Sequence, residues 1–440
     1  MRPSRYTVVE STGEGEHLLY NTANGAFAVL DDEAYEVWDS AGQLWGSVAQ
    51  DLMRYGFLTE MTPEEELASL QARLEEHRAK HDELTLCFVP TYACNFRCPY
   101  CYEYDRTHIG GKMDGPLMDV IMDFVHTRYE QDGFEKLSVQ WYGGDPSLAL
   151  DVVEELSERL IAWCVQAGVA YDALMLTNAN VIGPDEADII AKSRISMLLL
   201  TIDGPEEIHN QRRVAANGTN SYQKTLEAAR LLRERGVALS AFMNVDHLTW
   251  PLYTQTRDKM LIEEGIFVKP CRLCDYGHNY GTPPFAKPDF DLFTHEEFCQ
   301  ERLRQFGEER HSAGEMRELL RPNLQFCSGQ SGNYFVIDCK GDVFDCDGWV
   351  GYPEYVKFNI LDGPDAWKPS GIIFDAPRDS ACSQCEQLPM CLGSCIWERT
   401  LTGMPCYPIK DHIGGYLRIY RSCFGEVGPG FTLLAEPFEM

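Results

Sequence analysis

The stretch Cys94-Asn95-Phe96-Arg97-Cys98-Pro99-Tyr100-Cys101 decides the fold, because it places three cysteines in one short loop with the spacing C-x3-C-x2-C. A cubane of four irons and four sulfides takes a protein ligand on each iron, usually a thiolate. Three thiolates leave one iron without a protein ligand. A zinc loop is the alternative, but zinc sites usually take four ligands in paired motifs.

The surroundings of this loop predict an α/β domain. Residues 84–90 (LTLCFVP) form an apolar run typical of a buried strand that leads into the loop. Further strands are expected near 137–142, 172–177, 196–202, 237–245 and 266–270. Helices are expected around 116–131, 150–167, 184–193, 222–235 and 252–264. This alternation predicts six parallel strands in a partial (β/α)6 barrel, in which functional residues gather at the C-terminal ends of the strands.

Polar residues and glycines follow several of these predicted strands. After the second strand comes Gly143-Gly144-Asp145-Pro146, where glycines allow a close approach of the backbone to a ligand and an acid can bind an ammonium group. The other positions at strand ends are Thr177, Asn178, Thr201, Asp203, Arg213 and Asn244. A hydroxyl and an arginine at such ends suit ribose and carboxylate binding, although each of them could equally be a structural cap or a surface ion pair.

The cysteine loop and the strand ends together resemble the radical S-adenosylmethionine (SAM) enzymes. Gly143-Gly144-Asp145-Pro146 resembles the family's GGEP motif, with Asp145 in place of Glu, and Thr201-Ile202-Asp203-Gly204-Pro205 resembles its SIDGP stretch. The resemblance implies a [4Fe–4S] cluster on Cys94, Cys98 and Cys101, whose free iron binds SAM through its amine and carboxylate. It also implies that Tyr100 packs near the adenine.

A second cysteine array follows from residue 327. Cys327 is followed by Gly341 and Cys346, and then by the run C-x2-C-x5-C-x3-C and one more cysteine. This pattern resembles the SPASM extension, and seven or eight thiolates can hold two further cubanes. The resemblance assigns one auxiliary cluster to Cys327, Cys346 and Cys395. It assigns the other to Cys382, Cys385, Cys391 and Cys406. The chain is therefore expected to hold three [4Fe–4S] clusters.

Four more cysteines are possible additional ligands. The first auxiliary set lacks a fourth thiolate, and Cys339, Cys271 or Cys274 could complete it, or its iron could stay open. Cys423 could replace Cys406 in the second set. Cys271 and Cys274 follow the sixth predicted strand, so they could also handle substrate sulfur, or simply be buried structural thiols.

The first 60 residues predict a small α+β domain. Strand-like runs at 6–10 and 17–30, joined through the turn Asn21–Gly25, precede a helix that Asp31 and Asp32 can cap. A second helix is expected over 46–55. The pattern resembles the PqqD-like winged helix of peptide-modifying systems, which binds a leader peptide as an added strand. A structural cap without a binding role is the alternative.

The predicted organisation has six segments. Thr62-Pro63-Glu64-Glu65 opens a helix with an N-cap, a proline at the first position and a capping box. The segments are 1–60 (precursor recognition), 61–83 (linker helix), 84–285 (radical SAM partial barrel), 286–324 (helical linker), 325–410 (SPASM clusters) and 411–440 (C-terminal tail).

Composition limits the partners. The formal charge is −30, which disfavours binding to phosphate backbones, so no nucleic acid partner is expected. The charge suits a basic peptide or plain solubility. No signal peptide and no membrane-spanning run is visible, so a cytoplasmic protein is expected. Cysteines stay reduced there, and the 17 cysteines therefore indicate metal sites more than disulfides.

The resemblance implies an oxidoreductase that matures a ribosomally made precursor peptide (a RiPP). It would abstract a hydrogen from the peptide and form a thioether from a cysteine sulfur to carbon. The alternatives are carbon–carbon crosslinking, formylglycine formation by an anaerobic sulfatase-maturing enzyme, a small-molecule dehydrogenase and a non-catalytic iron–sulfur scaffold. A flavodoxin or ferredoxin is the expected electron donor. No catalytic base is singled out.

Overall fold

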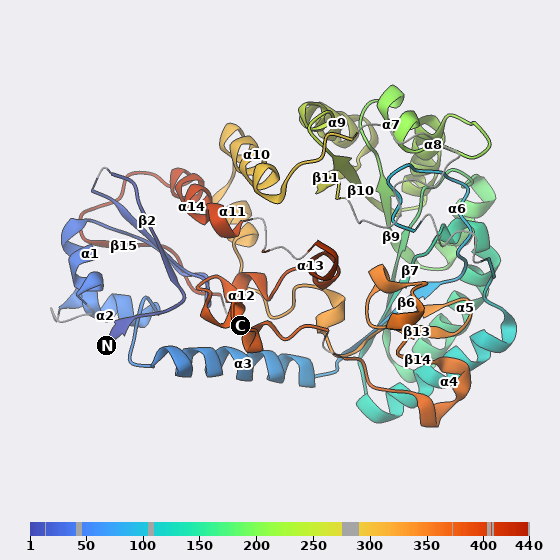
Figure 1. Cartoon of the computed structure of the whole chain (residues 1–440), viewed down its shortest axis with the longest axis horizontal. Helices are drawn as coiled ribbons and strands as arrows, with labels where there is room; N and C mark the ends of the chain where they lie inside the picture. Colours follow the sequence, from blue (N-terminus) through green and yellow to red (C-terminus); the bar gives the residue numbers. More distant parts are fainter. Residues whose placement is uncertain are drawn as a thin grey trace. The chain divides into compact units, whose positions relative to one another are not determined.

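The computed structural model describes residues 1–13, 15–40, 46–103, 110–274, 290–371, 373–402, 406 and 409–438. Two compact units build the chain (Figure 1). The first comprises residues 1–80, 294–330 and 373–440, and the second comprises 81–293 and 331–372. The predicted boundary between residues 285 and 286 lies outside the described residues.

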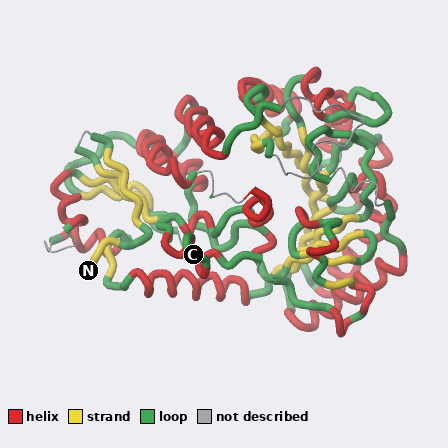
Figure 2. Tube along the Cα trace, in the orientation of Figure 1, coloured by secondary structure: helices red, strands yellow, loops and turns green. Residues whose placement is uncertain are grey.

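The second unit is built on one large sheet, drawn in yellow in Figure 2. Six of its strands are parallel neighbours in chain order: β6 (Glu83–Val89), β7 (Lys136–Trp141), β8 (Ala170–Leu176), β9 (Ile195–Thr201), β10 (Ala238–Val245) and β11 (Phe267–Arg272). The connecting helices are α4 (Gly115–Asp132), α5 (Leu150–Ala167), α6 (Pro184–Lys192), α7 (Glu206–Arg212), α8 (Ser221–Glu234) and α9 (Tyr253–Lys259). This confirms the predicted α/β class and the six parallel strands.

Burial explains why these segments form strands in the middle of the sheet. Leu84, Leu86 and Phe88 of β6 are fully buried, and Trp141 at the end of β7 packs against Phe88 with ring centroids 5.3 Å apart. A parallel strand covered on both faces has a nearly continuous apolar sequence, as LTLCFV does. Helix α4 begins where the Asp114 carboxylate accepts the Leu117 backbone N–H.

Three later strands extend the sheet beyond β6. The strand β12 (Tyr334–Asp338) pairs in parallel with β6, and β13 (Asp342–Phe344) and β14 (Phe358–Asn359) continue the sheet in antiparallel pairing. Residues 331–372 therefore belong to the second unit, whereas residues 373–410 belong to the first. The segment predicted as one cluster domain is divided between the two units.

The first unit contains the N-terminal elements and three later stretches of chain. Its strands are β1 (Arg2–Pro3), β2 (Thr7–Ser11), β3 (His17–Asn21), β4 (Phe27–Leu30), β5 (Leu58–Thr59) and β15 (Phe431–Ala435). Its helices are α1 (Asp32–Asp39), α2 (Ser47–Arg54), α3 (Pro63–Ala79), α10 (His295–Glu308), α11 (Ala313–Leu319), α12 (Leu388–Cys391), α13 (Ile396–Thr402) and α14 (Ile413–Ser422). The predicted caps are present: Asp31 caps α1, and Thr62 with Glu65 forms the capping box of α3.

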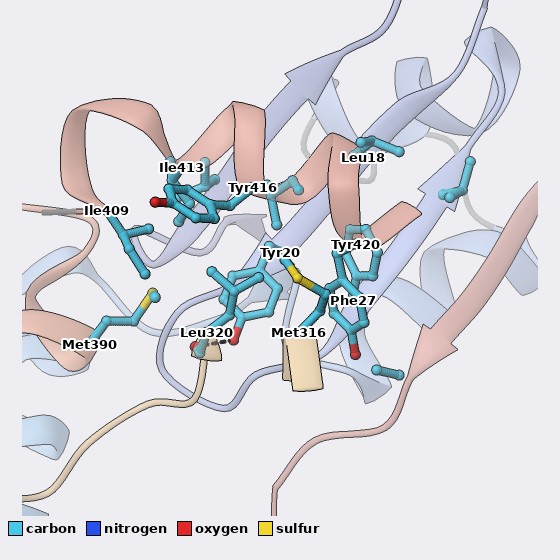
Figure 3. Close-up of a cluster of buried hydrophobic side chains, with 14 residues drawn as sticks. Leu18, Tyr20, Phe27, Met316, Leu320, Met390, Ile409, Ile413, Tyr416 and Tyr420 are labelled. Atoms are coloured by element: carbon cyan, nitrogen blue, oxygen red, sulfur yellow. Dashed lines mark hydrogen bonds between the residues drawn. The ribbon is translucent and has the colours of Figure 1, made fainter. Parts of the chain in front are cut away.

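One buried cluster joins the N-terminal sheet to the C-terminal helix (Figure 3). Phe27 of β4 stacks on Tyr420 of α14 with ring centroids 4.5 Å apart. The Tyr20 hydroxyl donates to the Leu320 carbonyl oxygen at 2.5 Å. The strand β15 forms the fourth strand of this sheet, in the order β15-β4-β3-β2. Residues 1–60 thus share their core with residues 313–320 and 409–435, and the predicted tail supplies a helix and a strand.

Among the helices of the described ranges, none is both long and apolar enough to cross a membrane.

Candidate active site

The C-terminal ends of the parallel strands surround a cavity of about 300 Å³ in the second unit. Most of the residues predicted for the radical SAM cluster and for SAM line it: Cys94, Cys98, Tyr100, Cys101, Gly143, Gly144, Asp145, Thr177, Asn178, Thr201, Arg213 and Asn244. Pro146 begins the short 3-10 helix η2 (Pro146–Ala149), and Asp203 is fully buried behind Tyr100. The structure therefore brings together residues that span 150 positions of sequence.

The cysteine loop is held against the segment that follows α7. The Arg97 N–H donates to the Val214 carbonyl oxygen at 2.7 Å, and the Ala216 N–H donates to the Asn95 carbonyl oxygen at 2.8 Å. The Arg213 guanidinium lies over the Phe96 ring, 5.3 Å from its centroid. These contacts fix the loop between its first and second cysteines.

The three cysteines fit an iron–sulfur cubane. Burial raises the pKa of the Cys94 thiol to about 12 and also raises the pKa of Cys98 and Cys101. Thiolates at this site therefore need a bound cation to offset their desolvation. In the described part of the chain, no three Cys, His, Asp or Glu side chains converge as ligands of a single metal ion. A cubane does not require that convergence, because each thiolate binds a different iron.

Gly143 and Gly144 are required by the approach of another loop. A Cβ atom on Gly144 would lie 2.3 Å from the Tyr92 carbonyl oxygen and 2.4 Å from that of Ala93. Gly143 has a φ of +110°, and its Cβ would lie 2.7 Å from the Thr91 carbonyl oxygen. The two glycines therefore leave room for the backbone that leads into Cys94. The sequence pattern predicts only that they leave room for a ligand.

The Asp145 carboxylate is fully buried and hydrogen-bonded. One oxygen accepts the N–H and hydroxyl of Ser147, at 2.9 and 2.5 Å, and the Thr177 hydroxyl at 2.8 Å. The other oxygen accepts the Asn178 N–H at 2.8 Å. The Asn178 amide in turn donates to the Asn95 side-chain oxygen at 2.7 Å. Asp145 therefore links the ends of β7 and β8 to the cysteine loop.

Tyr100 belongs to a second polar network. Its hydroxyl donates to the Asp203 carboxylate, and the Asn244 side-chain amide lies 3.3 Å from the Tyr100 oxygen and 3.2 Å from that carboxylate. Burial lowers the pKa of Arg213, but Cys98, Tyr100 and Asp203 raise it by more, so the guanidinium stays charged. The wall therefore presents the Arg213 cation beside several neutral donors.

Two of the additional cysteines reach this cavity. Cys271, at the end of β11, is exposed, and Cys274 is buried; both line the cavity. Cys339 lies outside the lining, with its sulfur 4.0 Å from the Gly110 carbonyl oxygen. Phe242 and Arg272 also line the cavity and were not predicted. Their positions near the C-terminal ends of β10 and β11 were the available signal.

The second auxiliary cysteine set lies within the first unit. The Cys385 N–H donates to the Cys382 carbonyl oxygen at 3.0 Å, and both cysteines pack on one apolar cluster. Cys391 ends α12, and the Lys410 ammonium donates to the Cys406 sulfur at 3.4 Å. Cys423 lies elsewhere, with its thiol donating to the carbonyl oxygens of His311 and Ile419. Of the first set, Cys327 and Cys395 lie in the first unit and Cys346 in the second.

Comparisons with known proteins identify the domain that holds the cavity. Residues 88–250 match the Radical SAM superfamily. These residues form a radical SAM domain. The chain is 24% identical over 349 residues to the cysteine-type anaerobic sulfatase-maturating enzyme of Clostridium perfringens, an alignment that covers 71% of this chain and 88% of that protein.

More distant relatives and a solved structure agree with this assignment. The mycofactocin maturase MftC of Mycobacterium tuberculosis is 23% identical over 334 residues, covering 73% of this chain and 80% of that protein. The structure of anSMEcpe with bound AdoMet and the Cp18Cys peptide has a TM-score of 0.57 at 18% identity and covers 78% of this chain and 96% of that chain. The chain is thus similar to maturases of peptides and proteins, and the family of the domain over residues 88–250 implies SAM and a [4Fe–4S] cluster.

Proposed function

We propose that this radical SAM enzyme matures a ribosomal precursor peptide by forming a thioether from a cysteine sulfur to a carbon atom. The observation that carries the proposal is the cavity in which three cysteines meet the polar ends of the parallel strands. Cys94, Cys98 and Cys101 would hold the radical SAM cluster. When bound, the cluster and SAM supply a 5′-deoxyadenosyl radical that removes a hydrogen atom from a substrate carbon.

The polar wall of the cavity would hold SAM. The Arg213 guanidinium is a cation suited to a carboxylate, and Thr201 and Asn244 offer polar groups for the ribose. Tyr100 would pack near the adenine. The resemblance to the GGEP motif predicts that Asp145 binds the methionyl amine of SAM. Since four protein donors already reach its carboxylate, we assign Asp145 mainly to positioning Asn178 and the cysteine loop.

Thioether formation removes two hydrogens from the peptide, and each proton and electron has a destination. The substrate thiol loses its proton, the carbon loses one hydrogen atom, and one further electron leaves when the carbon–sulfur bond forms. Auxiliary clusters would accept that electron and pass it on to a flavodoxin or ferredoxin, which also supplies the electron for SAM cleavage. The proposed ligands are Cys382, Cys385, Cys391 and Cys406 for one cluster, and Cys327, Cys346 and Cys395 for the other. Cys339, Cys271 and Cys274 remain the candidates for a fourth ligand.

The proposal gives the chain the six segments set out from its sequence. Residues 1–60 would bind the leader of the precursor, 84–285 would perform the radical chemistry, and 325–410 would carry the auxiliary clusters. Support for the first assignment comes from the small antiparallel sheet with helices α1 and α2 after β4. Residues 61–83 and 286–324 would be helical linkers, and residues 411–440 would be the C-terminal tail, which contributes α14 and β15 to the first unit.

Formylglycine formation is the second candidate, because sulfatase-maturating enzymes are among the relatives. The two reactions leave different peptides. A thioether removes two hydrogens and protects the cysteine from alkylation, whereas formylglycine from cysteine removes the sulfur from the residue. Carbon–carbon coupling would remove two hydrogens and leave every cysteine open to alkylation.

The test combines two measurements. Anaerobic co-expression with the small open reading frame nearest the gene, followed by mass spectrometry with and without alkylation, should give loss of two hydrogens and a protected cysteine. Loss of sulfur would favour formylglycine. An unmodified peptide, with SAM cleavage that needs no peptide, would favour a small-molecule substrate. Replacing Cys94, Cys98 and Cys101 with alanine should abolish 5′-deoxyadenosine release while the auxiliary iron remains; continued release would contradict the assignment of the loop.

A further inference from the structure

The N-terminal sheet carries an added strand from the far end of the chain. The strand β15 pairs antiparallel with β4, with Phe431 opposite Leu30 and Leu433 opposite Ala28. Thus the edge of β4 is closed by a segment 400 residues away in sequence. An extended segment added to a sheet edge is the geometry by which many domains bind peptides.

Side-chain contacts show what this edge accepts. The Phe431 ring stacks on Tyr55 with centroids 5.9 Å apart and meets the edge of Phe57 at 6.3 Å. Leu433, two positions on, packs into the same apolar cluster as Phe431. At the start of the segment, the Gly430 N–H donates to the Asp31 carboxylate at 2.7 Å. The edge of β4 therefore has apolar sites for alternate side chains beside a polar anchor.

A second anchor lies beyond the strand. The Phe438 N–H donates to the Asn24 carbonyl oxygen at 2.7 Å. Its ring lies 4.4 Å from the Arg317 guanidinium carbon and 5.0 Å from that of Arg321. Gly25 leaves room for this ring, since a Cβ atom there would lie 2.4 Å from it. An aromatic side chain between two cations is a specific contact.

The same segment has features of a displaceable strand. Four of the five residues of β15 are only half-buried, whereas four of the five residues of β3 are buried. In the described part of the chain β15 pairs with β4 alone, and its register shifts between Leu433 and Ala435. Gly428-Pro429-Gly430 leads into it. Edge strands with few buried contacts lie at the low end of local stability.

We propose that residues 430–438 occupy in cis the edge on which the leader of the precursor peptide docks, and that the leader binds by replacing them. The inference rests on the proposed function, because it names the surface that recognises the substrate. Its partner is an extended peptide with an aromatic and an apolar residue at alternate positions and a further aromatic residue that reaches Arg317 and Arg321. When the leader replaces residues 430–438, it forms the same backbone hydrogen bonds with β4. The affinity of the protein for the leader is therefore set by the side-chain sites. The leader competes with a tethered segment whose effective concentration is on the order of millimolar.

A peptide with the sequence of residues 429–438, labelled with fluorescein, tests this directly. It is titrated anaerobically into the full-length holoenzyme. Because Gly430 and Asp31 form a hydrogen-bonded pair, the Thr432 N–H is the next to point at β4. Thr432→Pro removes that donor and should release the cis strand, whereas Thr432→Val keeps it. We expect the peptide to bind the Thr432→Pro protein at least tenfold more tightly than the wild-type or Thr432→Val protein. Equal binding to all three would overturn the proposal and would place any bound peptide elsewhere, such as beside β2.

Hydrogen exchange on the wild-type protein covers the case in which Thr432→Pro does not fold. Amides of β15 should exchange at least tenfold faster than those of β3, and equal protection would overturn the proposal. Neither readout needs radical chemistry. If the protein released no 5′-deoxyadenosine, the proposed function would be contradicted, but the ratio of peptide affinities between the variants would not change. Equal binding of the peptide to the three proteins would contradict only the proposal that residues 430–438 compete with the leader.

Discussion

The Asp145 carboxylate accepts the backbone N–H of Asn178 at 2.8 Å, so the loop after β7 holds the end of β8. Three further donors, from Ser147 and Thr177, reach the other oxygen. In an Asp145→Asn protein, the amide group that replaces the second oxygen would face the Asn178 N–H, so two donors would meet. We expect a loss of about 1–3 kcal/mol in stability and weaker SAM binding.

Urea unfolding and SAM titration measure this prediction. Asp151→Asn is the matched control, because that carboxylate is 68% exposed and forms a surface ion pair with Lys112. A surface pair of this kind contributes about 0–1 kcal/mol. Equal behaviour of the two variants would mean that the buried network does not position the site.

Gly144→Ala should disrupt the radical SAM cluster loop. The new Cβ atom would meet the carbonyl oxygens of Tyr92 and Ala93, which are backbone atoms and cannot rotate away. Overpacking of this kind costs about 1–3 kcal/mol, and here it would displace the chain just before Cys94. Iron content and 5′-deoxyadenosine release should both fall. Gly115→Ala, with open space around its Cβ position, should leave both unchanged; a normal Gly144→Ala protein would contradict the packing argument.

Local patterns account for what the sequence predicts. The apolar run 84–90 and the alternation that follows it are periodic signals, and the six predicted strands of the second unit are present. The cysteine spacing is fixed by covalent distance along one loop, so its recognition needs no tertiary information. The strand-end residues meet because parallel strands place their C-terminal ends along one edge of the sheet.

Long-range pairing accounts for what was missed. Residues 431–435 (FTLLA) have the composition of a strand, but no local signal selects β4 as their partner. The same holds for β12, whose residues pair with residues of β6 that lie 249 positions earlier, such as Tyr334 with Thr85. Gly143 and Gly144 were recognised as sites of close approach, yet the approaching backbone of Thr91–Ala93 could be found only from the folded loops.

The second auxiliary cluster should depend on Cys406 and not on Cys423. Cys406 accepts a hydrogen bond from Lys410, whereas Cys423 donates to carbonyl oxygens of its own helix and of His311. We expect Cys406→Ala to reduce the reconstituted content by about four irons per chain. Cys423→Ala should keep the full content. Iron and sulfide analysis decides between them, and the reverse pattern would exchange the two assignments.

Histidine 209 should make stability depend on pH. Burial, with the nearby Arg213 charge, lowers the pKa of His209 from 6.5 to about 3, and its Nδ1 accepts the Asp203 N–H at 3.3 Å. Between pH 6.5 and 3 the unfolded chain therefore binds a proton that the folded chain does not, so stability falls as pH decreases through this window. At pH 5 the loss is about 2 kcal/mol.

The variant His209→Asn isolates the contribution of His209 to the pH dependence of stability, because an asparagine side chain does not titrate and its oxygen can accept the Asp203 N–H. The difference in unfolding free energy between wild-type and His209→Asn protein should be constant above pH 7. At pH 5 the wild-type protein should have lost about 2 kcal/mol of unfolding free energy relative to the variant. Urea midpoints across this pH range measure the difference. Carboxylates titrate in both proteins, so their contributions cancel. A difference that does not depend on pH would mean that His209 is protonated in the folded protein.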